Sequence, residues 1–315
     1  MPTFDVHPDM VPLVRTIELV FSFLFGAIVG SFLNACIWRI PRGISIVKRA
    51  RSFCPKCEAD IAWYDNIPIL SFIALRGRCR KCKEPISWRY EVVEILTALG
   101  FAAIVYHCRH LNGWGWGHTA VMCYLFASLV LITFVDLEHR IIPNEVTLSG
   151  IALAPVLSVL FPTLHQYAMI AGSPRLNALV SSIVGILLGG GHIWLLGVFG
   201  KIVFRKEAMG FGDVKLMAMV GGLLGWFPAV MATPMAACVG SIIGIVILIR
   251  TREHYLPFGP FLAIGTILMI FYSAFVFGYL MWALTGAPAP FRFEMPFVPW
   301  DAFGEWSAPG GAVYG

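Results

Sequence analysis

Charged side chains are scarce in this sequence of 315 residues. Asp, Glu, Lys and Arg together make up 13% of it, about half the share found in ordinary soluble domains, whereas hydrophobic residues make up 58%. The mean hydropathy is +0.77. This composition excludes an ordinary soluble domain and predicts a chain that lies in a lipid bilayer.

The sequence also lacks two motifs. The sequence contains no glycine-rich strand-to-helix turn of the kind that binds nucleotides. It also has no evident cleavable signal peptide, because the apolar run 17–38 is too long for a signal core and lacks a small-residue cleavage site behind it. The net charge of +5 reflects an uneven distribution of Lys and Arg between loops. We therefore do not expect nucleic acid as a partner.

Long apolar runs recur along most of the chain. A transmembrane helix needs about 20 apolar residues, and eight segments come near that length. The sixth has only 13 residues and needs a locally thin bilayer or an extension past Pro228. The predicted fold is an all-α polytopic membrane protein with about eight transmembrane helices. The predicted segments are 17–38, 92–107, 119–135, 146–161, 179–204, 214–226, 229–249 and 258–284.

Lys and Arg concentrate in every second loop. Loops 39–90, 136–145, 201–215 and 250–257 hold 12, 1, 4 and 2 of them, which is 19 of the 23. By the positive-inside rule these loops face the cytoplasm, and both chain termini lie outside.

The segments and loops divide the chain into five parts. We expect an outer N-terminal tail, a first transmembrane helix, a cytoplasmic domain, a transmembrane core and an outer C-terminal tail. The last is rich in Pro, Gly and aromatic residues and suggests no function. The parts are 1–16, 17–38, 39–90, 91–285 and 286–315.

Two carboxylates stand at the cytoplasmic ends of predicted membrane segments, where a charge is costly. Asp136 closes the third segment, and Asp213 follows Gly210 and Gly212 at the start of the sixth. The glycines lack side-chain bulk, so another helix can approach closely. Two acids in this setting indicate one catalytic site, although each alone could be a helix-end charge that reaches water.

Other polar and small residues have structural explanations beside functional ones. Asn34 is expected to make a packing hydrogen bond or to lie near the active site, and His139 and His192 are expected to be packing residues. Pro257 and Pro260 either shape a substrate entrance or begin the eighth helix. Glycines four residues apart indicate close helix packing, namely Gly185 with Gly189 and Gly221 with Gly225.

Four cysteines in the loop 39–90 have the spacing of a metal site. Two Cys-x2-Cys pairs are separated by 21 residues, and four thiolates can hold one Zn²⁺ in a tetrahedral site. A small domain with little core gains stability from the metal, and a cytoplasmic loop is too reducing for disulfides. Four protein ligands leave no open position for a catalytic water, so the zinc is expected to be structural. The ligands are Cys54, Cys57, Cys79 and Cys82, and the residues expected to be inert are Cys36, Cys108, Cys123 and Cys238.

Five stretches of the sequence resemble, in this order, the type IV prepilin leader peptidases, which are bifunctional bacterial inner-membrane enzymes. Together they span most of residues 26–270. The stretches are GSFLNACIWRIPRG, CPKCEADIAWYDNIPILSFIALRGRCRKCKEPISWRYEVVEILTA, VDLEHRIIPNEVT, MGFGDVK and PFGPFLAIG.

The resemblance implies an activity and its residues. The chain would remove the positively charged leader from prepilins and pseudopilins, after a glycine at the cytoplasmic membrane surface. It would then N-methylate the new N-terminal residue, with S-adenosyl-L-methionine as the methyl donor. The family's catalytic aspartates match Asp136 and Asp213. Its zinc ligands match Cys54, Cys57, Cys79 and Cys82. Asn144 and Glu91 depart from the usual family residues.

The resemblance places methyl-donor binding in the cysteine-bearing loop without assigning residues. Four neighbouring residues could contact the donor, but they could equally be packing and turn residues between the cysteine pairs. They are Trp63, Tyr64, Asp65 and Asn66. An alternative function is a transporter or channel with a zinc-stabilised cytoplasmic domain, in which the acids serve proton or cation passage.

Hydrolysis by two carboxylates requires one ionised acid to take a proton from water and one protonated acid to bind the scissile carbonyl. Helix direction suggests the assignment. Asp136 stands at a helix C-terminus, where the dipole disfavours negative charge, and Asp213 stands at a helix N-terminus, where the dipole favours it. We therefore expect Asp213 to carry the charge and Asp136 to hold the proton.

Overall fold

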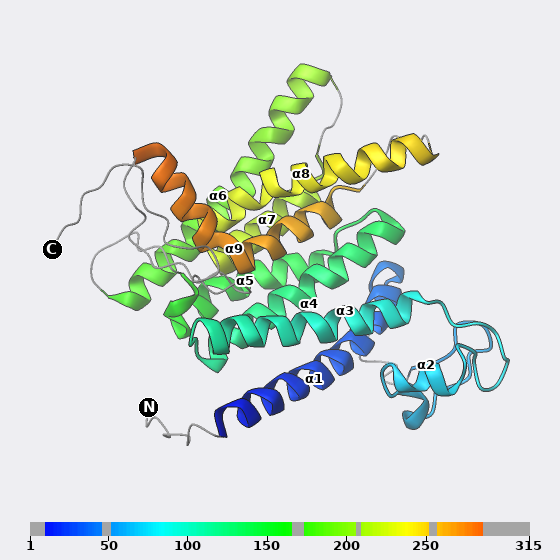
Figure 1. Cartoon of the computed structure of the whole chain (residues 1–315). Helices are drawn as coiled ribbons and strands as arrows, with labels where there is room; N and C mark the ends of the chain where they lie inside the picture. Colours follow the sequence, from blue (N-terminus) through cyan, green and yellow to red (C-terminus); the bar gives the residue numbers. More distant parts are fainter. Residues whose placement is uncertain (1–9, 46–51, 166–172, 206–208, 252–256, 286–315) are drawn as a thin grey trace.

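The structure, a computed structural model, describes residues 10–45, 52–165, 173–205, 209–251 and 257–285. These residues form an almost entirely helical architecture, as the sequence predicts (Figure 1). Residues 11–16, expected in the N-terminal tail, are helical. Residues 1–9 of the expected N-terminal tail and the whole expected C-terminal tail, 286–315, lie outside the described residues.

A long helix falls on each of the eight predicted segments. The long helices are α1 (Val11–Arg39), α3 (Arg89–Val105), α4 (Trp116–His139), α5 (Asn144–Leu160), α6 (Pro174–Phe204), α7 (Phe211–Leu224), α8 (Trp226–Thr251) and α9 (Gly259–Thr285). The short elements are η2 (Ile40–Arg42), η3 (Trp63–Asn66), α2 (Leu70–Ala74), η4 (Tyr106–Leu111) and η5 (Pro162–Leu164).

Six of the described helices are long and apolar enough to cross a membrane: α1, α3 with its continuation η4, α4, α6, α8 and α9. Helix α5 has 17 residues and α7 has 14. Helix α7 is short because Gly225, with φ of 91°, ends it, and α8 begins at Trp226. Pro228, expected to end or interrupt the sixth segment, lies in the first turn of α8.

Glycines let helices pack with their backbones in contact. A Cβ atom on Gly185 of α6 would lie 2.0 Å from the carbonyl oxygen of Gly221 in α7, and one on Gly221 would lie 2.0 Å from that of Gly185. A Cβ on Gly26 of α1 would lie 2.8 Å from the Cα of Ala98 in α3. The close packing predicted from the glycine spacing is therefore confirmed between α6 and α7, and it recurs between α1 and α3.

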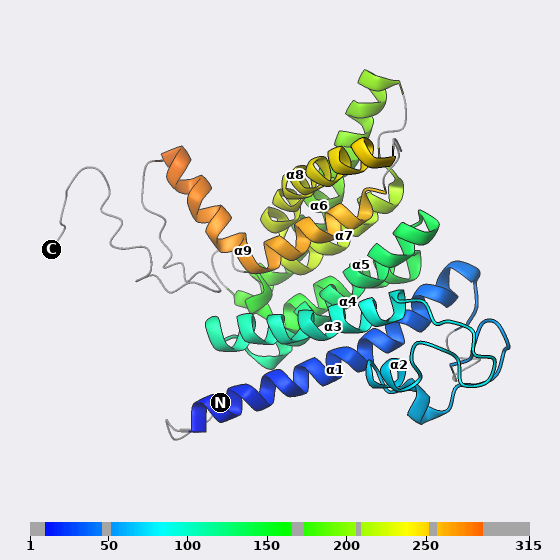
Figure 2. The same cartoon turned by 45° about the vertical axis from the view of Figure 1, so that its right-hand side comes forward.

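Helix α7 lies inside the bundle. Every residue from Leu216 to Leu224 is buried, and α5, α6 and α8 pack around it (Figure 2). Of the first turn of α7, Asp213 is also buried, whereas Phe211 is exposed.

A small domain of residues 52–88, here called the cysteine domain, lies where α1 ends and α3 begins (Figure 2). The backbone N–H of Ile69 donates to Glu94 Oε2 of α3 at 2.8 Å, and Glu94 is buried. Ile69 has φ of 63°, which is unfavourable for a β-branched residue. The bond to a buried carboxylate stabilises this conformation and fixes the cysteine domain against the membrane helices.

Candidate active site and metal site

Asp136 and Asp213 occupy one buried site. Asp136 lies in the last turn of α4 and Asp213 in the first turn of α7. Their exposed fractions are 6% and 7%. The segments that carry them are in contact, because Ile142, six residues after Asp136, packs against Gly212, the residue before Asp213. The structure thus brings together two acids that are 77 positions apart in the sequence, and their catalytic role stays a prediction.

The start of α7 holds the Asp213 side chain. The backbone N–H of Gly210, the residue before the helix, donates to Asp213 Oδ2 at 3.3 Å. This is the N3 half of a capping box, which satisfies an N–H at the helix start. A Cβ on Gly212 would lie 2.9 Å from Ile142 Cβ, in the link between α4 and α5. Gly212 therefore permits the approach of the chain that carries Asp136.

Asp136 has a partner that the sequence did not reveal. Its carboxylate accepts the backbone N–H of Gly259, the first residue of α9. A Cβ on Gly259 would lie 2.5 Å from Asp136 Oδ2, well inside contact distance. Gly259 belongs to the segment PFGPF, whose prolines alone suggest a substrate entrance or a helix start and give no sign of this contact.

Replacing Gly259 by alanine should therefore impair the site without weakening α9, because alanine is the better helix former. We expect hydrolysis at the carboxylate pair to fall by about 10- to 100-fold, the loss typical of a reacting group displaced by about 1 Å. Initial rates of hydrolysis by the purified protein would measure it. Gly191→Ala in α6 is the matched control, since its Cβ meets nothing within 4 Å. Equal rates for the two variants would show that close contact at Gly259 is not needed.

Charged neighbours of the pair have partners of their own. Lys215 Nζ donates to Asn144 Oδ1, which joins α7 to the start of α5. Glu138 of α4 forms an ion pair with Arg89 of α3. His139 Nε2, which lies 3.9 Å from Glu138 in the same helix, has no hydrogen-bond partner among the described residues. These contacts hold together the helix ends around the two aspartates.

Two polar residues within the apolar helices make the packing bonds expected of them. Asn34 Nδ2 of α1 donates to the carbonyl oxygen of Tyr90 in α3 at 2.9 Å. His192 Nε2 of α6 lies 2.7 Å from Thr233 Oγ1 of α8. Both bonds link neighbouring helices.

The structure brings the four predicted cysteines together. The sulfur atoms of Cys54, Cys57, Cys79 and Cys82 all lie within 4.8 Å of one another. Cys54 Sγ and Cys82 Sγ are 3.9 Å apart. A tetrahedron with Zn–S distances of about 2.3 Å has sulfur atoms about 3.8 Å apart, so this donor set fits such an ion. The group could hold a metal ion.

The two Cys-x2-Cys pairs adopt the same turn. In the first, the N–H of Glu58 donates to the carbonyl of Cys54 at 2.8 Å, and in the second, Lys83 donates to Cys79 at 3.0 Å. Glu58 and Lys83 both have positive φ, of 55° and 59°. Backbone N–H groups of Cys82 and Lys81 lower the pKa of the Cys79 thiol to about 7, which favours the thiolate form that binds metals.

Asp65 ties the segment between the pairs to the second turn. Its carboxylate accepts two bonds from Arg80, at 2.7 Å from Nε and 2.6 Å from the terminal nitrogen. This guanidinium lowers the pKa of Asp65. Trp63 is 80% exposed, and Tyr64 is 51% exposed. Asp65 thus has the turn-stabilising partner expected of a structural residue.

Fold and site together define an all-helical membrane protein with a buried pair of carboxylates and a tetra-cysteine group outside the helix bundle. Family models agree with that class. One described as the bacterial peptidase A24 N-terminal domain matches residues 24–108, and one described as the type IV leader peptidase family matches residues 123–249. The chain belongs to the type IV leader peptidase family.

Curated relatives cover most of the chain. A prepilin leader peptidase/N-methyltransferase of Myxococcus xanthus is 39% identical over 74% of this chain and 64% of its own length. A prepilin leader peptidase/N-methyltransferase of Aeromonas hydrophila is 34% identical over 77% of this chain and 87% of its own length. A relative from Escherichia coli, named type 4 prepilin-like proteins leader peptide-processing enzyme, is 34% identical over 86% of this chain and 97% of its own length. No solved structure matches the chain significantly. These relationships do not favour the transporter or channel alternative.

Proposed function

We propose that this chain is a membrane-embedded aspartic endopeptidase that removes the leader from type IV prepilins and pseudopilins. In the same proposal it N-methylates the residue that cleavage exposes. The observation that carries the proposal is the buried pair of Asp136 and Asp213 in a member of the type IV leader peptidase family. The names of its relatives support both activities.

The pair suits peptide hydrolysis. One carboxylate, ionised, takes a proton from a water molecule as the water oxygen attacks the scissile carbonyl carbon. The other, protonated, donates a hydrogen bond to the carbonyl oxygen and stabilises the charge that develops there. Two neighbouring carboxylates favour this state because they share one proton more readily than they both ionise. The apolar part of the substrate remains in the bilayer, which positions its cleavage site.

The tetra-cysteine group would bind one structural Zn²⁺. Its four thiolates fill a tetrahedral site, so the metal holds the two turns together and takes no part in hydrolysis. S-adenosyl-L-methionine would supply the methyl group in the second reaction. The protein would lie in the bacterial inner membrane, with the aspartates and the cysteine domain on the cytoplasmic side and both termini outside. The asymmetry of Lys and Arg between loops supports this orientation.

One assay tests both activities. The purified protein in lipid nanodiscs would be incubated with a prepilin and isotope-labelled S-adenosyl-L-methionine, and the pilin analysed by mass spectrometry. We expect a shortened pilin that carries one labelled methyl group at its new N-terminus. A prepilin in which the glycine before the cleavage site is replaced is the control and should stay intact. An unshortened pilin at full incorporation of the protein would contradict the peptidase function.

A further inference from the structure

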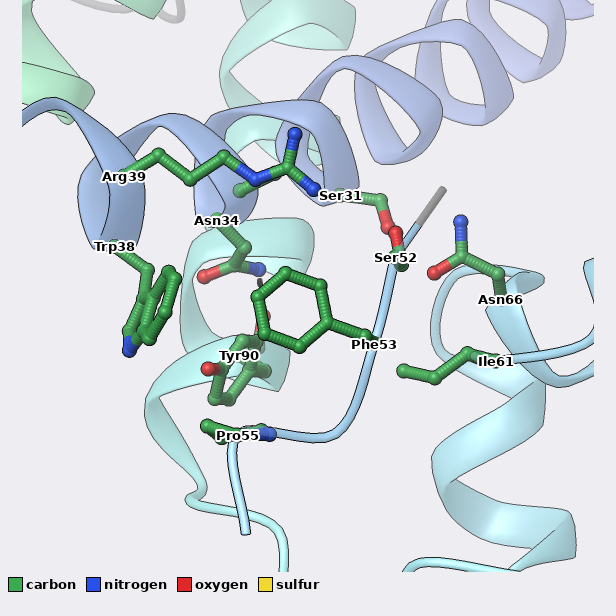
Figure 3. Close-up of a pocket in the computed structure, with 11 residues that line it drawn as sticks. Ser31, Asn34, Trp38, Arg39, Ser52, Phe53, Pro55, Ile61, Asn66 and Tyr90 are labelled. Atoms are coloured by element: carbon green, nitrogen blue, oxygen red, sulfur yellow. Dashed lines mark hydrogen bonds between the residues drawn. The ribbon is translucent and has the colours of Figure 1, made fainter. Parts of the chain in front are cut away.

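We propose that a small pocket between α1 and the cysteine domain binds the amino-acid end of the methyl donor, which carries an ammonium and a carboxylate group. The proposal rests on the proposed methyltransferase function. The pocket has a volume of about 100 Å³ (Figure 3). It is lined by Ser31, Asn34, Ala35, Trp38, Arg39, Ser52, Phe53, Pro55, Ile61, Asn66 and Tyr90. None of these residues comes from α4, α7 or α9, which build the carboxylate pair.

Asn34 supplies a buried acceptor to this pocket. Its side chain is 3% exposed, and the bond from Nδ2 to the carbonyl of Tyr90 fixes the orientation of the amide. The amide oxygen is buried and has no hydrogen-bond partner among the described residues. In the view of Figure 3 this oxygen lies on the side of Trp38. Leaving a buried acceptor unpaired is unfavourable, so the pocket suits a ligand that donates a hydrogen bond, such as an ammonium group.

Positive charge and aromatic rings complete the match. Arg39 is only 4% exposed, and its guanidinium lies 5.8 Å from the Phe53 ring. None of the eleven lining residues is acidic. Arg39 is therefore the lining residue that a ligand carboxylate would contact. Trp38 and Phe53 meet edge to face, with ring centroids 5.4 Å apart, and form an apolar wall for the carbon chain.

The volume limits what can enter. A volume of about 100 Å³ suits the amino-acid end of the donor. The adenosine would extend along the side that Ser52, Ile61 and Asn66 of the cysteine domain supply. In this proposal, the cysteine domain packs against the end of α1 because the two together form the donor pocket.

Direct binding of the donor tests the site. Equilibrium dialysis with radiolabelled S-adenosyl-L-methionine, in the absence of any peptide substrate, would be carried out on the whole protein and its variants. We expect Asn34→Leu to weaken binding about tenfold or more, as for the loss of a hydrogen bond to a charged group. Trp38→Leu should weaken it severalfold. Trp63→Leu, an exposed tryptophan of the same domain outside the pocket, is the matched control and should bind normally.

Leader cleavage by the same preparations reports whether each variant is folded, because the aspartates lie on other helices. If Asn34→Leu loses cleavage as well, Trp38→Leu decides the question. Normal binding in the folded pocket variants would overturn the pocket and leave the methyltransferase function intact. Weakened binding in Trp63→Leu alone would place the donor at the exposed aromatic residues instead. If the wild-type protein cleaves leaders but binds no donor, the methyltransferase function fails and the pocket with it.

Discussion

Replacing Asp213 or Asp136 by asparagine is expected to abolish leader removal in either single variant. Hydrolysis needs one ionised and one protonated carboxyl group, and an amide can neither accept the proton of water nor share one with its neighbour. The cleavage rate should fall by at least about 10²- to 10⁴-fold, the range typical of losing a general acid or base. Asparagine has nearly the same shape as aspartate, so both variants should still insert into the membrane. Cleavage of a purified prepilin would measure the loss.

Methylation separates a chemical effect from misfolding. A pilin whose leader has already been removed should still be methylated by both variants, because the pair acts only on the peptide bond. Glu145→Gln, in the first turn of α5, is a matched change of an exposed acid near the site and should cleave normally. Cleavage above a trace in one of the aspartate variants would remove that residue from the catalytic pair.

Loss of one cysteine of the tetra-cysteine group is expected to empty the metal site. The wild-type protein should contain one Zn²⁺ per chain, and Cys54→Ser or Cys79→Ser should contain almost none. Structural zinc sites contribute about 10–16 kcal/mol of binding free energy in zinc-finger peptides, which is free energy of folding for so small a domain. The cysteine domain should therefore become sensitive to proteases in both variants. Elemental analysis and limited proteolysis would check the two effects.

The control for the cysteine variants is Cys238→Ser. Cys238 lies in α8, exposed on the helix and remote in sequence from the four clustered thiols. It should keep its zinc and its resistance to proteases. Wild-type protein that was purified without chelators and contains no zinc would contradict the assignment.

Most of the helical architecture could be predicted, because the length of each apolar segment can be counted in the sequence. The position where α7 ends could not be predicted. The sequence predicts that this helix ends near Trp226, with a break at Pro228. In the structure, the positive φ of Gly225 ends the helix, and Pro228 lies in the first turn of α8. Proline is tolerated in a first turn, since the N–H it lacks has no partner there. Which glycine takes a positive φ is decided by packing.

The carboxylates and the cysteines could be recognised in the sequence, because their residue types and spacing are typical of a catalytic pair and of a metal site. The residues that pack around them could not be predicted. Gly259 lies 123 positions after Asp136 and reaches it only through the packing of α9 against α4. This contact also weakens the reason given for assigning the shared proton. Asp136 ends its own helix, where the dipole disfavours its charge, but it also lies at the N-terminus of α9, where the dipole favours that charge. Asp213 lies only at a helix N-terminus, so helix direction still favours its charge, by less than the sequence alone suggests.

The enclosure of α7 has a consequence for how the protein responds to its bilayer. A helix of 14 residues is about 21 Å long, whereas the hydrocarbon layer is about 30 Å thick. Membrane thickness acts on helices that touch lipid, which must tilt or deform the bilayer when their lengths differ from it. The buried residues Leu216–Leu224 touch only protein. The depth of Asp213 is therefore set by the neighbouring helices, so lipids of different chain length can adjust the outer helices while the carboxylate keeps its position in the protein.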